Sequence, residues 1–278
     1  MIVAFLDATA SARPVLEMAI RLAELLDLGV VAVHVEAAEP PSPATPTELA
    51  ASRGVDLRTV PGPVAETVLE EAGRPGVEAV VMGARTTEAG RRPVGSTTRH
   101  VIQRCPRPVL IVPPEAIDSR PLRTALVPLD GTAQASSALD AWIPRLAGQM
   151  ALIGLHVFTM GTSPPMLDRP VRDMLMLADE FQERHLPGAD RVEMRSGHVA
   201  ARIIELSGER GADLVVLSWS QSGAPGRAQT VLEVLSLSQI PTFLLPPVAA
   251  APGPPDDGDQ LPADSGRERS EPAPTREW

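Results

Sequence analysis

The sequence contains no lysine, asparagine or tyrosine, so all 25 of its basic residues are arginine. The missing lysine excludes a Walker-type phosphate-binding lysine and a Schiff-base lysine, and the missing tyrosine excludes a tyrosine general acid. A single cysteine, Cys105, excludes an internal disulfide and favours a reducing compartment. The sequence therefore argues against enzymes that depend on such a lysine or tyrosine.

Aromatic residues and long apolar runs are also scarce. Aromatics make up 3% of the 278 residues and the net charge is −10, and both values argue against nucleic-acid binding. No apolar run approaches the roughly 18 residues that span a membrane, and Asp7 interrupts the first hydrophobic stretch. We therefore expect a cytoplasmic protein with no membrane segment, whose partners are small molecules or proteins.

The sequence does contain an internal repeat, in which one unit occurs twice. The opening "MIVAFLDAT" resembles "TALVPLDGT" at 124–132, and the apolar runs end at Asp7 and Asp130. Near the end of each unit, "RPVLIVPP" at 107–114 corresponds to "IPTFLLPP" at 240–247. Self-similarity over this spacing indicates a duplicated domain.

Each unit alternates apolar runs of Val, Ile and Leu with amphipathic stretches such as 12–26 and 135–147. Such runs are typical of parallel strands buried on both faces, and the alternation requires right-handed crossovers. We predict an α/β fold of two tandem doubly wound five-stranded parallel sheets with flanking helices, in domains 1–114 and 122–247. The Pro-rich, acidic residues 248–278 predict a disordered, solubilising tail.

The two units differ by an insertion. The spacing between matching residues grows from 122 (His34 to His156) to 135 (Gly83 to Ser218), so about 13 residues enter the second unit. They fall around "MLDRPVRDMLMLADEFQERH", which predicts a helix covering the core or, alternatively, a Met-rich groove for a partner. We expect the units to pack on each other as an intramolecular pseudo-dimer, with a homodimer of whole chains left open.

The segment "MGARTTEAGRRPVGSTTRH" at 82–100 is the strongest candidate for a binding site. Ligands of open parallel sheets bind beyond the carboxyl ends of the strands. Gly83 permits close backbone approach, and Gly95 and Ser96 begin a helix whose first N–H groups attract anions. Six arginines follow Gly83, against the single acid Glu88. They are Arg85, Arg91, Arg92, Arg99, Arg104 and Arg107.

This pattern predicts a phosphate site, with an ordinary helix start beside a solvated arginine face as the alternative. The second unit, at 218–240, has no Gly-Ser pair at the helix start and carries Ser218-Trp219 in place of Gly83-Ala84. We therefore expect its site to be lost. Trp219 then either packs in the core or fills the space of a ligand.

Other polar residues have structural alternatives. Asp7 and Asp130 follow a strand and precede a helix, so they are candidates either for a ligand site or for helix capping. His34 and His156 occupy matching strand ends, which favours a shared structural role over metal binding. Cys105 has no neighbouring base and is interpreted as a buried small residue. We identify no catalytic residue and no metal site.

On these residues the sequence resembles the universal stress protein family in its tandem form, over about residues 1–247. The matching features are an Asp closing the first strand, a His-Val strand end, the loop glycines with their Ser, and a Pro-Val-Leu type of last strand. In this sequence they are Asp7, His34-Val35, Gly83, Gly95-Ser96 and "RPVLIVPP". Thr86 stands where the family has a second Gly, the spacing from Gly83 to Gly95 is one residue short, and Ala8 replaces the Gly that often follows the Asp.

The resemblance implies ATP binding in the N-terminal unit, with the accompanying Mg²⁺ left open. The strand-end residues would lie near the adenosine and the loop residues at the phosphates, and Arg85 joins them for its charge. The set is Asp7, Val35, Gly83, Arg85, Gly95, Ser96 and Thr97.

We therefore expect a nucleotide-responsive stress regulator that binds ATP or a related adenine nucleotide and signals to a protein partner, with at most slow hydrolysis. One alternative is a structural or interaction protein in which both sites are degenerate. A second is an enzyme acting on a phosphorylated or adenylylated substrate, which the fold by itself does not support.

Overall fold

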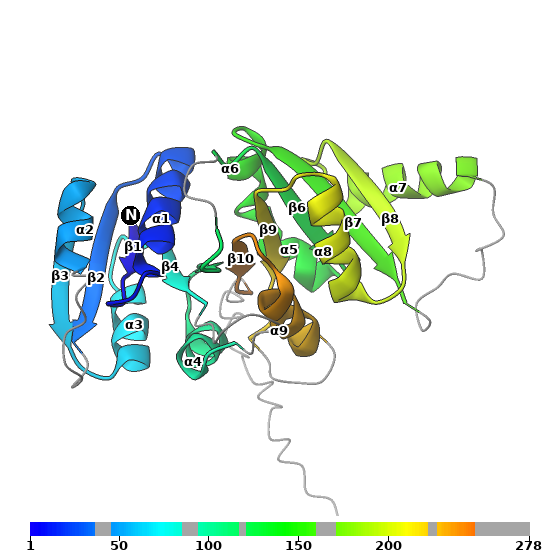
Figure 1. Ribbon diagram of the computed structural model, residues 1–278. Coiled ribbons are helices and arrows are strands. Elements are labelled where there is room, and N and C mark those ends of the chain that lie inside the picture. The colour runs from blue at the N-terminus through cyan, green and yellow to red at the C-terminus, as the bar shows by residue number, and fades with distance from the viewer. Residues whose placement is uncertain (37–45, 85–93, 117–120, 160–170, 222–226, 248–278) are drawn as a thin grey trace, which may run out of the picture. The chain divides into compact units, whose positions relative to one another are not determined.

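The structure is a computed structural model (Figure 1) that describes residues 1–36, 46–84, 94–116, 121–159, 171–221 and 227–247. Within these ranges the chain forms two successive α/β repeats. The predicted tail at 248–278 lies outside the described residues. The strands of both repeats belong to one sheet, which does not mark a boundary between them. The domain limits at 1–114 and 122–247 therefore stay a prediction.

The first repeat alternates strands and helices as its apolar periodicity predicts. Its elements are β1 (Ile2–Phe5), α1 (Ala12–Leu26), β2 (Val30–Glu36), α2 (Pro46–Ser52), β3 (Asp56–Pro61), α3 (Val64–Ala72), β4 (Ala79–Gly83), α4 (Ser96–Arg104) and β5 (Val109–Val112).

The second repeat follows the same order with one additional helix. Its elements are β6 (Thr124–Leu129), α5 (Ala133–Asp140), α6 (Ile143–Ala147), β7 (Ala151–Phe158), α7 (Val171–His185), β8 (Arg191–Ser196), α8 (Val199–Glu209), β9 (Leu214–Ser218), α9 (Arg227–Leu237) and β10 (Thr242–Leu245). The stretch predicted as one helix over 135–147 is two helices. Pro144 explains the break, because it has no N–H to continue the helix and its ring clashes with the preceding turn.

The sheet has the strand order β3-β2-β1-β4-β5-β10-β9-β6-β7-β8. Strands pair in parallel within each repeat, and the one antiparallel pair among the described strands joins β5 to β10. In that pair Thr242 faces Ile111 and Leu244 faces Val109. The α/β class with a mostly parallel sheet and flanking helices is confirmed.

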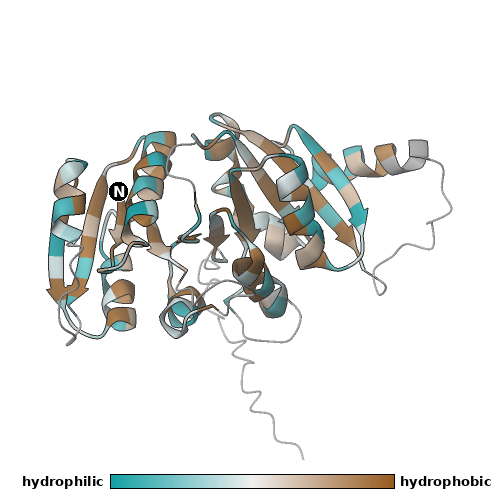
Figure 2. Ribbon diagram, in the orientation of Figure 1, coloured by the Kyte–Doolittle hydropathy of each residue, from teal (hydrophilic) through white to brown (hydrophobic). Residues whose placement is uncertain are grey.

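Two apolar layers cover the two faces of this sheet. Ile2, Ala4 and Leu6 pack in one layer with residues of α1, α2, α5 and α6, whereas Val3 and Phe5 pack in the other with residues of α3, α4, α8 and α9. This alternation follows from the two-residue period of a strand. Figure 2 shows the apolar colour gathered along the inner strands. The helices cover both faces, so the carboxyl ends of the strands remain as the places where polar groups converge.

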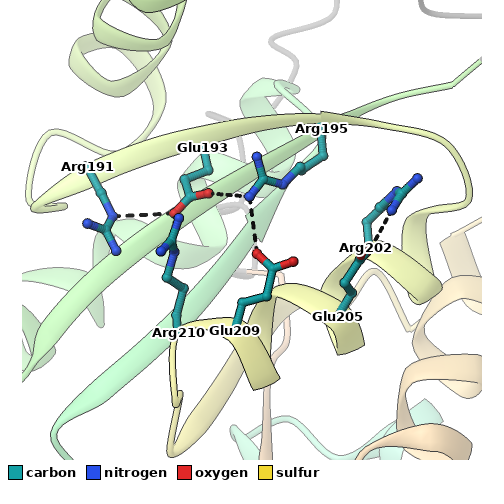
Figure 3. A network of polar contacts seen from close by, with 7 residues as sticks. All are labelled: Arg191, Glu193, Arg195, Arg202, Glu205, Glu209 and Arg210. Atoms are coloured by element: carbon teal, nitrogen blue, oxygen red, sulfur yellow. Dashed lines mark hydrogen bonds and ion pairs between the residues drawn. The ribbon is translucent and has the colours of Figure 1, made fainter.

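The edge strands carry charge. On β8, the Glu193 carboxylate contacts Arg195 Nη2 at 2.9 Å and Arg210 Nε at 2.6 Å, with Arg191 at 3.5 Å (Figure 3). Arg195 also reaches Glu209 at 3.3 Å. At the other edge, Arg58 of β3 pairs with a carboxylate of α3. Charged side chains on an edge strand discourage pairing with another sheet.

Candidate functional site

Asp7 lies where β1 ends, with its side chain exposed. Its Oδ1 accepts hydrogen bonds from the backbone N–H of Thr9 at 3.0 Å and from the Thr9 hydroxyl at 2.7 Å. The Thr9 hydroxyl in turn accepts from the N–H of Ser11 at 3.2 Å, and Ser11 occupies the N-cap position of α1 without a side-chain capping bond. Asp7 therefore braces the turn between β1 and α1, and helix capping does not explain it.

The second repeat makes the corresponding hydrogen bonds at its first turn. Asp130 Oδ1 accepts from the Thr132 N–H at 2.9 Å and from its hydroxyl at 2.7 Å, and Thr132 is the N-cap of α5. The turns differ at their middle residue. Gly131 has φ +78°, which favours glycine, whereas Ala8 lies outside the left-handed region. The substitution of Ala for Gly in the first repeat thus accompanies a different backbone conformation.

His34 and His156 make matching bonds at neighbouring strand ends. Nδ1 of His34 lies 2.8 Å from the Leu6 carbonyl oxygen, and Nδ1 of His156 lies 2.9 Å from that of Leu129. Because a carbonyl only accepts, each Nδ1 carries the proton and donates it. The geometry agrees with the structural role favoured by the sequence. Within the described residues, no three side chains of His, Cys, Asp or Glu are grouped so as to hold a metal ion.

Strand register brings Asp7 and Val35 to one level of the sheet and Gly83 to the level one residue before it. Phe5 pairs with Val33 and Ala4 pairs with Val81. Continuing these registers by two residues places Asp7 level with Val35 of β2 and Leu6 level with Gly83 of β4. Since β1 ends at Phe5 while β2 runs to Glu36, main-chain groups at Val35 extend past the paired part of β1.

The start of α4 is attached to the end of β4. Gly95 is the N-cap of α4, no side chain caps the helix, and its first turn has no acidic residue. The Thr98 hydroxyl donates to the Gly83 carbonyl oxygen at 3.3 Å, and Thr98 is 1% exposed. This contact holds the exposed Ser96 and the half-buried Thr97 near the strand end. Arg85 and the rest of 85–93 lie outside the described residues.

Thr98 was missed in the sequence, although its spacing carried a signal. Thr98, Val101 and Ile102 occur at i, i+3 and i+4, which is the inward face of a helix, and all three are buried. A hydroxyl on such a face needs a partner, and the nearest one is the end of the preceding strand. The helical period applied to α4 would therefore have singled out Thr98 rather than Thr97.

The corresponding place in the second repeat holds Ser218 and Trp219. The Trp219 N–H donates to the Leu245 carbonyl at 2.8 Å, just as the Ala84 N–H donates to Val112 at 2.9 Å, but the indole Nε1 donates to the Ile102 carbonyl oxygen at 2.7 Å. Trp219 is 3% exposed. Packing against the C-terminal end of α4 in the first repeat therefore accounts for this tryptophan, and other residues line the Asp130 turn.

Cys105 is buried at the end of α4, as the sequence predicted. Burial raises the pKa of its thiol, and this effect outweighs the opposing influence of the Arg107 backbone and charge. A thiol with a raised pKa stays protonated near neutral pH, and the thiolate is the nucleophilic form. Cys105 is thus a packing residue.

Known proteins agree with this architecture. The model of the universal stress protein family matches residues 44–113 and 121–246, which together exceed half of the chain. The match begins after Asp7 and Val35. The assignment of these two positions therefore depends on their correspondence with the second repeat. Comparison with curated protein sequences gives no match.

Two solved structures share the fold over most of the chain. A protein of unknown function from Pseudomonas aeruginosa PAO1 has a TM-score of 0.62 at 15% identity, over 88% of this chain and 92% of its own. A universal stress protein from Archaeoglobus fulgidus has a TM-score of 0.62 at 16% identity, over 88% and 97%. With the family model matched in both halves, the chain belongs to the universal stress protein family.

Proposed function

We propose that this chain is a nucleotide-responsive regulator that binds ATP or a related adenine nucleotide in its first repeat. The observation that carries the proposal is the bond from Thr98 to Gly83, which holds the uncapped start of α4 at the strand end. The first N–H groups of a helix lack internal partners and attract anions, so this end suits the phosphates. Asp7 and Val35, at the same level of the sheet, suit the nucleoside.

The proposal assigns the chain a signalling role rather than rapid turnover. Bound nucleotide would change the surface around α4 that a protein partner meets, and a ligand shifts such an equilibrium by its differential affinity for the two states. The compartment proposed is the cytoplasm. Within the described residues no helix is long and apolar enough to cross a membrane. Steady release of phosphate from ATP would instead favour an enzyme.

A charge placed at the start of α4 tests this proposal. Ser96→Glu adds a carboxylate where the helix dipole favours it, so the free protein should keep or slightly gain stability, while the phosphates should be repelled. Addition of ATP at about 100-fold excess over its Kd should stabilise the wild type by about 2.7 kcal/mol, and this gain should vanish in Ser96→Glu. Thermal melting with and without ATP measures both effects.

Gln229 offers the matched control, because it holds the position of Ser96 in the second repeat at the spacing of 133 set by the last strands. Gln229 is the exposed third residue of α9, and its Nε2 donates to Glu233 at 3.2 Å. Gln229→Glu gives up that bond but likewise adds a carboxylate to the first turn of a helix, and it should leave the ATP response intact. Mass spectrometry of the protein as isolated should find adenine nucleotide. A wild-type chain that carries none and gains nothing from ATP would support the interaction protein in which both sites are degenerate.

A further inference from the structure

Four rings gather beyond the strand ends of the second repeat. His156 and Phe158 come from β7, and Phe181 and His185 come from α7; we call these four residues the ring cluster. The ring centroids of His156 and Phe181 lie 4.6 Å apart, as do those of Phe181 and His185, and His156 meets Phe158 edge-on at 4.8 Å. These separations are typical of attractive ring pairs.

The ring cluster is fixed at both ends. Nδ1 of His156 donates to the Leu129 carbonyl oxygen at 2.9 Å, at the end of β6. Nδ1 of His185 lies 3.1 Å from the Ser136 hydroxyl of α5. Phe181 is therefore held between two histidines that are themselves attached to the elements flanking the Asp130 turn.

Phe181 lies directly against that turn. A Cβ atom added at Gly131 would come within 3.1 Å of Phe181 Cε2 and within 4.0 Å of His156 Cε1. The ring thus fills the space beside Asp130, at the carboxyl end of the strand, which is where ligands of open parallel sheets are bound. A larger side chain at Gly131 would displace it.

The first repeat has no residue that could do the same. Between Phe5 and Trp142 the sequence contains no Phe, Tyr or Trp. At the spacing of 122, Glu36 stands where the second repeat has Phe158, and the chain has no aromatic counterpart of Phe181 before β3. Both phenylalanines of the ring cluster are thus particular to the second repeat, and Phe181 belongs to the inserted segment.

We propose that α7 supplies the second repeat with an internal occupant: Phe181 takes the place of a flat, uncharged ligand ring beside the Asp130 turn and so closes this repeat to ligand. The class of ligand follows from the surroundings. Rings line the place and the Asp130 carboxylate beside them disfavours an anion, while the strand end that would hold phosphate carries Ser218 and Trp219 in place of Gly83 and Ala84. The proposal concerns the second repeat and does not rest on nucleotide binding in the first.

Removal of the Phe181 ring tests the proposal in the full chain. The probes are adenosine and benzimidazole, which present flat rings without phosphate. Each response is taken as the difference between Phe181→Ala and the chain that retains Phe181, so that binding of a probe in the first repeat cancels. Phe181→Ala should melt several degrees lower than the wild type, and either probe at tenfold excess over its Kd should raise its melting temperature by about 3 °C more than that of the wild type. The chain that retains Phe181 should show only the response of the first repeat.

Leu175→Ala serves as the matched control, because Leu175 lies on the same helix with its side chain exposed. It should change neither stability nor probe binding. If Phe181→Ala does not fold, Phe181→Leu with benzimidazole provides the same comparison with a smaller opening. A folded Phe181 variant that binds neither probe would overturn the proposal, as would an equal response to the probes in the chain that keeps Phe181. Neither result depends on whether ATP stabilises the wild type.

Discussion

The two repeats share their scaffold and differ in what lies beyond the strand ends. Each has an Asp that accepts from a Thr two residues later and a His that donates to the carbonyl at the end of the neighbouring strand. Beyond the strand ends, the first repeat has Gly83 and the start of α4, whereas the second has Phe181 packed against Gly131. Duplication thus kept the groups that brace the turns, and the neighbouring side chains diverged.

The two edge strands of the sheet also differ in which element carries the carboxylate and which carries the arginines. In the first repeat a buried carboxylate, Glu71, pairs with Arg58 of β3 and with Arg74, and its side chain is 2% exposed. In the second repeat the carboxylate, Glu193, lies on the strand β8 and the arginines surround it (Figure 3). The two edges of the sheet therefore carry opposite placements of charge, and charged side chains on either edge strand discourage pairing with another sheet.

The largest expected loss of stability comes from replacing Trp219 of the second repeat by the residue found in the first. Trp219→Ala introduces the residue found at Ala84, removes a buried ring and should cost about 3–5 kcal/mol of unfolding free energy. Trp219→Phe keeps most of the ring but loses the bond from Nε1 to the Ile102 carbonyl oxygen and should cost about 1 kcal/mol. Urea denaturation measures both. A loss below 1 kcal/mol for the alanine variant would contradict the packing described for this residue.

A second comparison separates the two charge networks. Glu71→Gln keeps the size of a buried side chain but removes its charge, and should cost about 1.5–3 kcal/mol because two charge-assisted contacts with arginine are lost. Glu209→Gln in the second repeat should change stability by less than about 0.5 kcal/mol, since Glu209 is exposed and its partner Arg195 also contacts Glu193. Equal losses in the two variants would show that burial does not distinguish the networks.

The smallest expected effect is a pH dependence confined to the second repeat. Burial lowers the pKa of His185 below its ordinary value of 6.5, the charges of Arg184 and His156 lower it further, and Asp130 opposes them. The folded chain therefore binds this proton less tightly than the unfolded chain. Stability that is present above pH 6.5 should be lost as the pH falls from 6.5 through the folded-state pKa.

His185→Gln keeps a polar group near Ser136 and removes the titration. Its melting temperature should fall less than that of the wild type between pH 7.5 and pH 5.5. Thermal melting across this range, in the full chain, measures the difference in slope. Parallel slopes for the two proteins would contradict the role assigned to His185.

Much of the architecture could be predicted from local patterns. Runs of Val, Ile and Leu fixed the strands, and the amphipathic period fixed most helices, because burial on both faces of a sheet imposes those patterns. The stretch 135–147 was predicted as one helix because its apolar period continues past Asp140, where α5 ends because Pro144 has no N–H to continue the helix. Arg85, predicted at the phosphates, stays a prediction because it lies outside the described residues.

The site was predicted less completely, because contacts join residues that are distant in sequence. Thr98 reaches Gly83 across 15 positions and Trp219 reaches Ile102 across 117. The helical period marks Thr98 as an inward residue, but no local pattern marks Trp219 as a partner of Ile102. Trp219 was considered as a filler of the second site, yet the ring beside Asp130 is Phe181 from the inserted helix. A single sequence shows that an insertion exists but not which face it covers.

The sequence by itself determined the duplication, the α/β class and the positions of Asp7, Asp130 and Gly83 at strand ends, since these depend on periodicity within each segment. The tertiary structure alone decided which side chains meet beyond those ends. The packing of helices on the sheet set the partners of Thr98, Trp219 and Phe181, and close packing leaves each of them a single arrangement. Two copies of one fold could therefore acquire different sites without any change in strand order.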